Sequence, residues 1–300
     1  MNDTSGNDYY DDYMPSQEQA ITYGAITAVS SFIGVVVYAF VLWSIFADAY
    51  NRKQPAYRLM FIVGIFDCIQ LTINCAIGFF IIFNPTIPDL LNQLIGALLN
   101  IAWYDSLFHS TALSLNRLLI IVFNKTNFAK KEGFVISIVL ANFFSLLFSA
   151  LEFFYPFDYQ FDFQFLGYLD MGGGTYNFIG IPISIELISS LNNYALIVDV
   201  GVSLCVFLVI LIYIAHRTAR CCNPLSKTAG TGLSGAEKTI TINALALSAS
   251  AMVLFLYSQF IVSNLPETHF TDFLFTFVWI LYLFVKPFMT LATNPYVFFY

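Results

Sequence analysis

The chain has 300 residues, of which 58% are hydrophobic and only 10% are charged, and its formal net charge is -7 at pH 7. A soluble globular domain carries about 25% charged residues, so this composition cannot cover a water-facing surface and excludes an ordinary soluble domain. The acidic balance also argues against nucleic-acid binding, which relies on basic surfaces.

Seven stretches are long and apolar enough to form transmembrane helices, because about 20 helical residues cross the roughly 30 Å hydrocarbon layer of a bilayer. In chain order they cover residues 21–46, 59–83, 92–123, 134–154, 189–215, 240–262 and 273–299. In the first half of the fifth stretch, acidic and amide side chains lower the hydrophobicity. The pattern predicts an all-α membrane protein, a seven-transmembrane helix bundle.

The basic residues are confined to one side of these helices. The loops after the first, third and fifth helices, with the adjoining helix ends, hold eleven of the twelve lysines and arginines: Arg52, Lys53, Arg58, Arg117, Lys125, Lys130, Lys131, Arg217, Arg220, Lys227 and Lys238. The amino-terminal segment and the other three loops contain Asp and Glu but no Lys or Arg. Since Lys and Arg are enriched in cytoplasmic loops, the pattern predicts an N-terminus outside and a C-terminus inside.

Residues 1–20 are predicted to form an extracellular acidic tail, and residues 21–300 the transmembrane domain. The tail has neither the basic region nor the cleavage site of a signal peptide, so the first helix is expected to direct insertion. Asn2 begins an Asn-Asp-Thr sequon and is a candidate for glycosylation. Cys221 and Cys222, which follow the fifth helix beside basic residues, are candidates for palmitoylation, with free thiols as the equal alternative.

Polar and ionisable side chains inside a membrane are energetically costly and mark functional sites by default. Asp67 falls in the middle of the second predicted helix. It is either a neutral carboxyl group hydrogen-bonded to a neighbouring helix, or an ion or proton site with two states. In the third helix Ser106, Ser110 and Arg117 lie on one face. Arg117 then either extends its guanidinium to the lipid headgroups or has a functional role.

Three further charged residues are predicted within the membrane. Asp105 in the third helix, Asp199 in the fifth and Lys286 in the seventh are candidates for lining a ligand pocket. A cation buried as deeply as Lys286 needs a partner, and Asp67, Asp105 or a backbone carbonyl of the sixth helix can each supply it. The same four groups permit a rival interpretation, a relay in a small transporter or ion-conducting protein.

The sequence gives little support for an enzyme. Outside the predicted spans it contains no nucleophile paired with a base, no glycine-rich phosphate loop and no cluster of metal ligands. The three histidines, His109, His216 and His269, are scattered over three segments, which disfavours a metal site.

Several short motifs resemble those of the rhodopsin-like G-protein-coupled receptors, and their order fits over nearly the whole chain. They are Asp67 in the second helix, Ser-Leu-Asn-Arg-Leu at residues 114–118, and Asn294-Pro295 near the end of the seventh helix. The stretches 56–60, 64–67 and 104–106 are similar to the nematode serpentine chemoreceptors, with classes X and T nearest. The resemblance implies a chemosensory receptor that passes an extracellular small-molecule signal to a heterotrimeric G protein, in the plasma membrane of a sensory neuron or its cilium.

The resemblance also implies roles for individual residues. Arg117 matches the arginine that a G protein engages, and Glu237, at the start of the sixth helix, matches the acid that pairs with that arginine at rest. Asp67, Ser106 and Asn294 match a buried polar site that holds a sodium ion in many relatives. Beyond this ion, no cofactor is expected.

The sequence departs from the receptor pattern at its inner end. The acid that usually precedes the arginine is replaced by Asn116. Phe298 replaces the tyrosine of the motif that begins with Asn294 and Pro295, so this motif offers no hydroxyl group to bridge to Tyr213. Coupling to a G protein is therefore an inference from the remaining motif residues.

Two other features of relatives are not expected. The disulfide between the third helix and the second outer loop cannot form, because Asn92 occupies the expected position and the loop lacks cysteine. Lys286 lies two residues further from Pro295 than the retinal-binding lysine of opsins does. Two residues rotate a helix by about 200°, so Lys286 is not expected to bind retinal.

Overall fold

The computed structural model describes residues 15–125, 131–153, 159–162, 167–170, 175–178, 181–221, 235–266 and 268–293. Within these residues the chain forms seven long helices. They are α2 (Gln17–Ala47), α4 (Pro55–Phe83), α5 (Asp89–Ile121), α7 (Glu132–Phe153), α8 (Ile185–Cys221), α9 (Gly235–Leu256) and α10 (His269–Thr293). The short helix α3 (Ala49–Lys53) follows α2, and a π turn (Tyr257–Ile261) and a 3₁₀ turn (Val262–Asn264) follow α9.

Each predicted span corresponds to one of the seven long helices. Five of them, α2, α4, α7, α8 and α10, contain a segment long and apolar enough to cross a membrane. The other two contain more polar residues: α5 carries the predicted polar stripe, and the described apolar part of α9 is the shorter segment Ala244–Leu256. The arrangement of hydrophobic segments therefore predicted the helices well, because a bilayer leaves helices as the simplest way to satisfy backbone hydrogen bonds.

The first helix begins earlier than predicted. It starts at Gln17, inside the segment expected to belong to the acidic tail. The hydroxyl group of Ser16 accepts a hydrogen bond from the backbone nitrogen of Gln19 at 3.3 Å, and the Gln19 side chain accepts one from the Ser16 nitrogen at 3.0 Å. This reciprocal pair is a capping box, which satisfies two donors at the helix start and fixes the boundary there.

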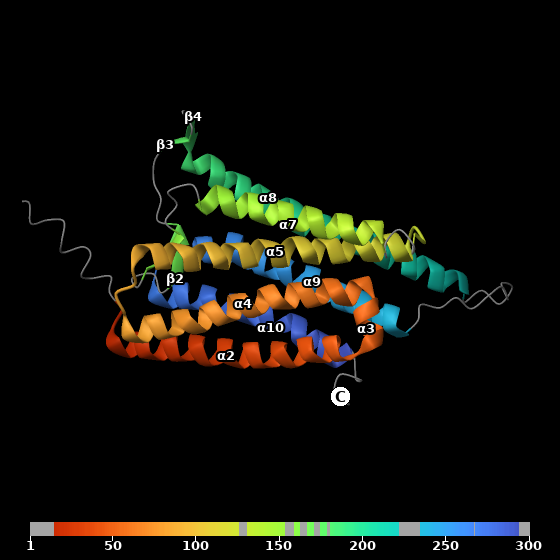
Figure 1. Ribbon diagram of the computed structural model, residues 1–300, viewed down its shortest axis with the longest axis horizontal. Helices are drawn as coiled ribbons and strands as arrows, with labels where there is room; N and C mark the ends of the chain where they lie inside the picture. Colours follow the sequence, from red (N-terminus) through yellow and green to blue (C-terminus); the bar gives the residue numbers. More distant parts are fainter. Residues whose placement is uncertain are drawn as a thin grey trace, which may run out of the picture.

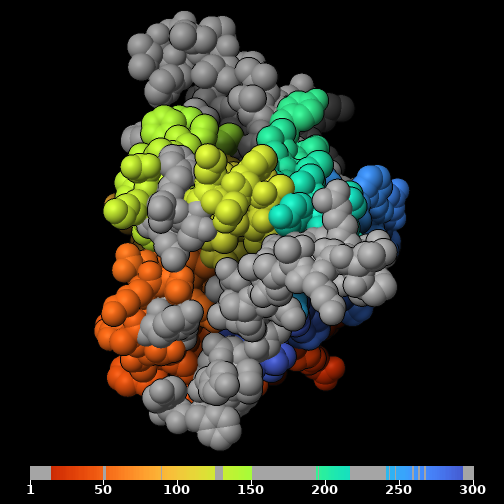
Figure 2. Space-filling view, turned by 90° about the vertical axis from the view of Figure 1, so that its right-hand side faces the viewer, coloured from red at the N-terminus to blue at the C-terminus, as the bar shows by residue number. Residues whose placement is uncertain are grey.

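The central helix of the bundle is α5, which contacts α4, α7, α8 and α9. In Figure 1, α2, α4 and α10 lie on one side of α5, and α7 and α8 lie on the other. The short helix α3 and the end of α10 lie at the end of the bundle that faces the viewer in Figure 2. Because α3 contains Arg52 and Lys53, this end corresponds to the predicted inner side.

Two short antiparallel hairpins separate α7 from α8 in the sequence, and they lie at the opposite end of the bundle (Figure 1). Strand β1 (Tyr159–Asp162) pairs with β2 (Gly167–Asp170), and β3 (Thr175–Phe178) pairs with β4 (Ile181–Ser184). The predicted all-α architecture included no strands here. Aromatic and β-branched residues favour extended pairing over helix in this segment, so the hairpins add to an otherwise helical fold.

Two glycines allow α2 and α4 to approach closely. A Cβ atom added to Gly78 would lie 2.5 Å from the backbone nitrogen of Ala28 and 2.6 Å from the carbonyl oxygen of Gly24. Backbone atoms cannot move aside as a flexible side chain can. Small residues at such positions let membrane helices pack by direct backbone contact.

We expect Gly78→Ala to destabilise the protein, because the added methyl group must push α2 and α4 apart. Overpacking of this kind costs roughly 1–3 kcal/mol. The melting temperature of the purified protein in detergent should fall by several degrees. Gly201→Ala in α8 is the matched control, since nothing lies within 4 Å of its added Cβ. Equal melting temperatures for the two variants would contradict the close packing of α2 on α4.

Candidate functional site

Asp67 is fully buried in the middle of α4, with 0% of its surface exposed, and side chains from three other helices donate hydrogen bonds to it. The Ser106 hydroxyl group of α5 donates to its Oδ1 at 2.7 Å. The Tyr38 hydroxyl group of α2 donates to its Oδ2 at 2.5 Å and also approaches the carbonyl oxygen of Leu283 at 3.1 Å. The structure thus brings Asp67 and Ser106 together, as the sequence predicted.

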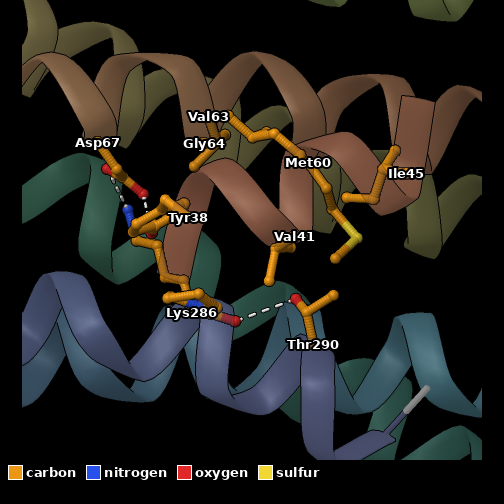
Figure 3. A pocket seen from close by; sticks show the side chains of 11 residues that line it. Tyr38, Val41, Ile45, Met60, Val63, Gly64, Asp67, Lys286 and Thr290 are labelled. Atoms are coloured by element: carbon orange, nitrogen blue, oxygen red, sulfur yellow. Dashed lines mark hydrogen bonds and ion pairs between the residues drawn. The ribbon is translucent and has the colours of Figure 1, made fainter. Parts of the chain in front are cut away.

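Lys286 of α10 completes this group. Its ammonium nitrogen lies 3.0 Å from Asp67 Oδ1 and 2.7 Å from the hydroxyl oxygen of Ser106. Only 6% of the lysine is exposed, and its ammonium lies 4.9 Å from the centre of the Tyr282 ring. Figure 3 shows Tyr38 and Lys286 pointing toward Asp67. Of the three partners left open for this lysine, the structure selects Asp67, and we call Tyr38, Asp67, Ser106 and Lys286 the Asp67 cluster.

A glutamine links the cluster to an aromatic group. The Gln70 amide nitrogen lies 3.5 Å from Asp67 Oδ1 and donates to the carbonyl oxygen of Ala102 at 3.2 Å. Its amide oxygen accepts a hydrogen bond from the Trp279 indole at 3.1 Å. Trp279 packs edge-on against Trp103, with ring centres 5.0 Å apart. The Asp67 cluster is therefore continuous with aromatic side chains of α5 and α10.

Sequence reasoning missed Tyr38, Gln70 and Trp279 as neighbours of Asp67. A signal for Tyr38 was present, because Thr27, Ser31 and Tyr38 recur at helical spacing along α2 and all are buried. Such a polar face on an apolar helix indicates that the face packs against protein and not lipid. For Gln70, the position three residues after Asp67 predicts the same face of α4.

Asp105 takes part in a different set of contacts. The His109 Nδ1 atom lies 2.8 Å from the backbone carbonyl oxygen of Asp105 and 3.6 Å from its Oδ1. The other ring nitrogen of His109 lies 3.5 Å from the side-chain amide of Asn142 in α7. Asp105 and His109 are both buried, so this pair connects α5 to α7.

Asp199 lies in a third place, on α8. The Thr111 hydroxyl group lies 2.6 Å from that of Ser203 and 3.5 Å from the backbone carbonyl oxygen of Asp199. Asp199 also lines a largely apolar hollow of about 710 Å³ between α5, α7 and α8. Among the described residues, no hydrogen bond or ion pair joins Lys286 to Asp105 or Asp199. Lys286 is therefore paired directly with Asp67, and a ligand pocket that it shares with Asp105 and Asp199 stays a prediction.

At the inner end of α5, Arg117 is 4% exposed and donates a hydrogen bond from its Nη2 atom to the Asn116 side-chain oxygen at 3.1 Å. Asn116 is buried as well. Protein atoms surround the Arg117 side chain, which is almost entirely shielded from the surface of the bundle. This position disfavours the interpretation in which Arg117 only extends to the lipid headgroups.

A family model for the serpentine type 7TM GPCR chemoreceptor Srt matches residues 10–218, which is more than half of the 300-residue chain. The chain belongs to this family. No curated protein is significantly similar to it. Membership confirms the resemblance to serpentine chemoreceptors and favours class T over class X. The protein is thus a multi-pass membrane protein of a receptor family, not of an enzyme family.

Three members of the Asp67 cluster, Tyr38, Asp67 and Ser106, lie within the part of this Srt receptor that the family model matches, whereas Lys286 lies after it. The site does not fit the sodium ion that the resemblance to rhodopsin-like receptors implies. The Lys286 ammonium group already lies against Oδ1 of Asp67, and Tyr38 donates to Oδ2.

The remaining candidate residues are described only in part. Tyr213 of α8 is half-buried and packs against the cluster of Ile121, Val206 and Ile210. Glu237 lies in the first turn of α9 and Cys221 ends α8, but their side chains are outside the described part of the receptor. The glycosylation, palmitoylation and helix 7 candidates Asn2, Cys222, Asn294, Pro295 and Phe298 also lie outside the described residues.

Proposed function

We propose that this Srt receptor converts the binding of an extracellular small molecule into activation of a heterotrimeric G protein. The match to a chemoreceptor family of G-protein-coupled receptors is the observation that carries the proposal. The buried Arg117 at the inner end of the central helix supports it, because this arginine matches the residue that a G protein engages in related receptors. We propose that Arg117 changes its hydrogen-bonded partners on activation and so acts as a switch. Its proposed neighbours in this switch are Glu237, Asn116 and Tyr213.

The Asp67 cluster supports a route for the signal. One carboxylate joins α2, α4, α5 and α10, so a shift of any of these helices changes its hydrogen bonds. Toward the hairpin end, Gln70 connects the cluster to Trp279. Toward the other end, α5 continues to Arg117, about 16 Å along the helix axis from Ser106 at 1.5 Å per residue. Ligand binding near the aromatic group would therefore bias the inner end through α5 and α10.

The receptor is proposed to lie in the plasma membrane, with its N-terminus outside and the loop between α8 and α9 inside. An epitope tag at the N-terminus should then be labelled by antibody on intact cells, because the basic loops stay in the cytoplasm. A tag inserted after Gly230 should be labelled only after the cells are permeabilised. Labelling of the Gly230 tag on intact cells would overturn the orientation. Localisation to a sensory cilium is a further part of the proposal.

The function is tested by a screen of volatile and water-soluble small molecules on cells that express the receptor with a G-protein dissociation sensor. We expect at least one compound to produce a response that untransfected cells lack. The rival function, a relay for transport or conduction, receives less support, because contacts of the described residues join only Asp67 and Lys286 among the four charged groups. Compound-dependent current without any sensor response would favour it.

A further inference from the structure

We propose that the ammonium group of Lys286 is a built-in cation that occupies the position of a monovalent ion on Asp67, so that this receptor binds no sodium there. This ion position lies entirely within the membrane bundle. It does not depend on ligand identity or on G-protein coupling, and either can fail without affecting it.

Three groups surround the lysine nitrogen. It lies 3.0 Å from a carboxylate oxygen of Asp67 and 2.7 Å from the hydroxyl oxygen of Ser106. The Tyr282 ring lies on another side, 4.9 Å away, where its π electrons attract a cation. Acidic, hydroxyl and aromatic groups from three helices thus replace the hydration shell that a buried cation loses.

Both carboxylate oxygens of Asp67 are already engaged. Oδ1 meets Lys286 and Ser106, and Oδ2 accepts the hydrogen bond of Tyr38 at 2.5 Å. Tyr38 is held in this position by α10 as well, because its hydroxyl group also lies 3.1 Å from the Leu283 carbonyl oxygen. A sodium ion would have to displace one of these groups to reach the carboxylate.

Charge and space both disfavour a second cation in the cluster. One carboxylate faces one ammonium group, so the cluster has no excess negative charge to retain a second cation, and two cations this close repel strongly in a poorly polarisable interior. The adjoining cavity, lined in part by Tyr38, Asp67, Lys286 and Thr290, has a volume of about 30 Å³ (Figure 3). A cavity of this size has room for about two water molecules, so an ion can enter it only after losing most of its hydration shell.

A cation attached to α10 cannot dissociate into the surrounding solution. The link between α4, α5 and α10 then depends on helix position and not on the sodium concentration. Removing the ammonium group should leave the Asp67 carboxylate and the Ser106 hydroxyl group as ligands, and free space that a small cation can enter.

The test compares the melting temperature of the purified receptor in sodium chloride, potassium chloride and choline chloride at equal ionic strength. The wild-type protein should melt at the same temperature in all three salts. Lys286→Met should gain a saturable, sodium-dependent rise of about 2–3 °C over choline, because an ion that binds only the folded state stabilises it. The double variant Asp67→Asn with Lys286→Met should lose this rise, since the carboxylate that holds the ion is gone.

Two outcomes overturn the proposal. Sodium-specific stabilisation of the wild-type receptor that disappears in Asp67→Asn would show that an ion binds despite the lysine. A well-folded Lys286→Met variant that responds equally to all three salts would show that the ammonium group does not occupy an ion position. If Lys286→Met does not fold, the wild-type comparison still decides, and the more polar Lys286→Gln variant replaces it in the second arm.

Discussion

Neutralising one partner of the buried ion pair should lower the stability of the receptor by about 3–5 kcal/mol, the usual cost of leaving one charge of a buried pair without its counterion. We expect this loss for Lys286→Met, which keeps the length of the side chain but removes the ammonium group, and for Asp67→Asn. Both residues are buried, at 6% and 0% exposure, so bulk water does not solvate the charge that remains.

The double variant Asp67→Asn with Lys286→Met should recover most of the loss, because no uncompensated charge remains. Thermal unfolding of the purified proteins in choline chloride measures all three variants without interference from sodium. Lys53→Met is the matched control, since this lysine is exposed on α3, and its melting temperature should not change. Strictly additive losses in the double variant would show that the two residues do not form an energetically coupled pair.

The second large effect concerns Arg117. We expect Arg117→Ala and Arg117→Lys to reach the cell surface but to lose about 10- to 100-fold in ligand-driven G-protein activation, because hydrogen bonds to a charged group contribute roughly 1.5–3 kcal/mol. A switch residue must exchange hydrogen-bonded partners, such as Asn116 in the described structure and the G protein when active. The planar guanidinium group can hold two partners at once, and the ammonium group of lysine lacks this geometry.

Arg52→Lys serves as the control, since Arg52 is an exposed cation at the same end of the bundle and should tolerate the change. Surface density is measured for every variant by antibody against an N-terminal tag, so that trafficking losses are separated from coupling losses. A fully active Arg117→Lys variant at normal surface density would leave Arg117 only a structural role.

The sequence was sufficient to predict the seven helices and the Asp67–Ser106 contact. The reason for the helices differs from the reason for the contact. Helices follow from apolar length alone, because unpaired backbone groups are too costly in lipid. The contact between Asp67 and Ser106 followed from the resemblance to rhodopsin-like receptors. In that fold, residues at these two motif positions pack at one buried site.

The partner of Lys286 could not be predicted in the same way. Hydropathy gives the length of a helix but not its rotation about its own axis, so Asp67, Asp105 and a backbone carbonyl remained equal choices. Asn294, which the resemblance to rhodopsin-like receptors assigns to the same buried polar site, lies outside the described residues, so its placement there stays a prediction. In the described part of α10 the residue that reaches Asp67 is Lys286, which precedes Pro287 in the way that Asn294 precedes Pro295.

The hairpins between α7 and α8 were also missed. Strands of four residues are too short to give a clear hydrophobic pattern, and the three consecutive glycines at residues 172–174 are more typical of an irregular loop than of a strand. The contacts of Asp105 and Asp199 depend on which side of α5 faces each neighbouring helix, and hydropathy along a single sequence does not determine this.

Coupling to a G protein is tested most directly with purified components. The receptor is reconstituted into lipid vesicles with a heterotrimeric G protein, and binding of a non-hydrolysable GTP analogue is followed with and without an active compound from the cell screen. We predict that the compound accelerates nucleotide binding and that Arg117→Ala removes the acceleration. Compound-dependent ion current or uptake in vesicles that lack the G protein, with unchanged nucleotide binding in those that contain it, would contradict the receptor function.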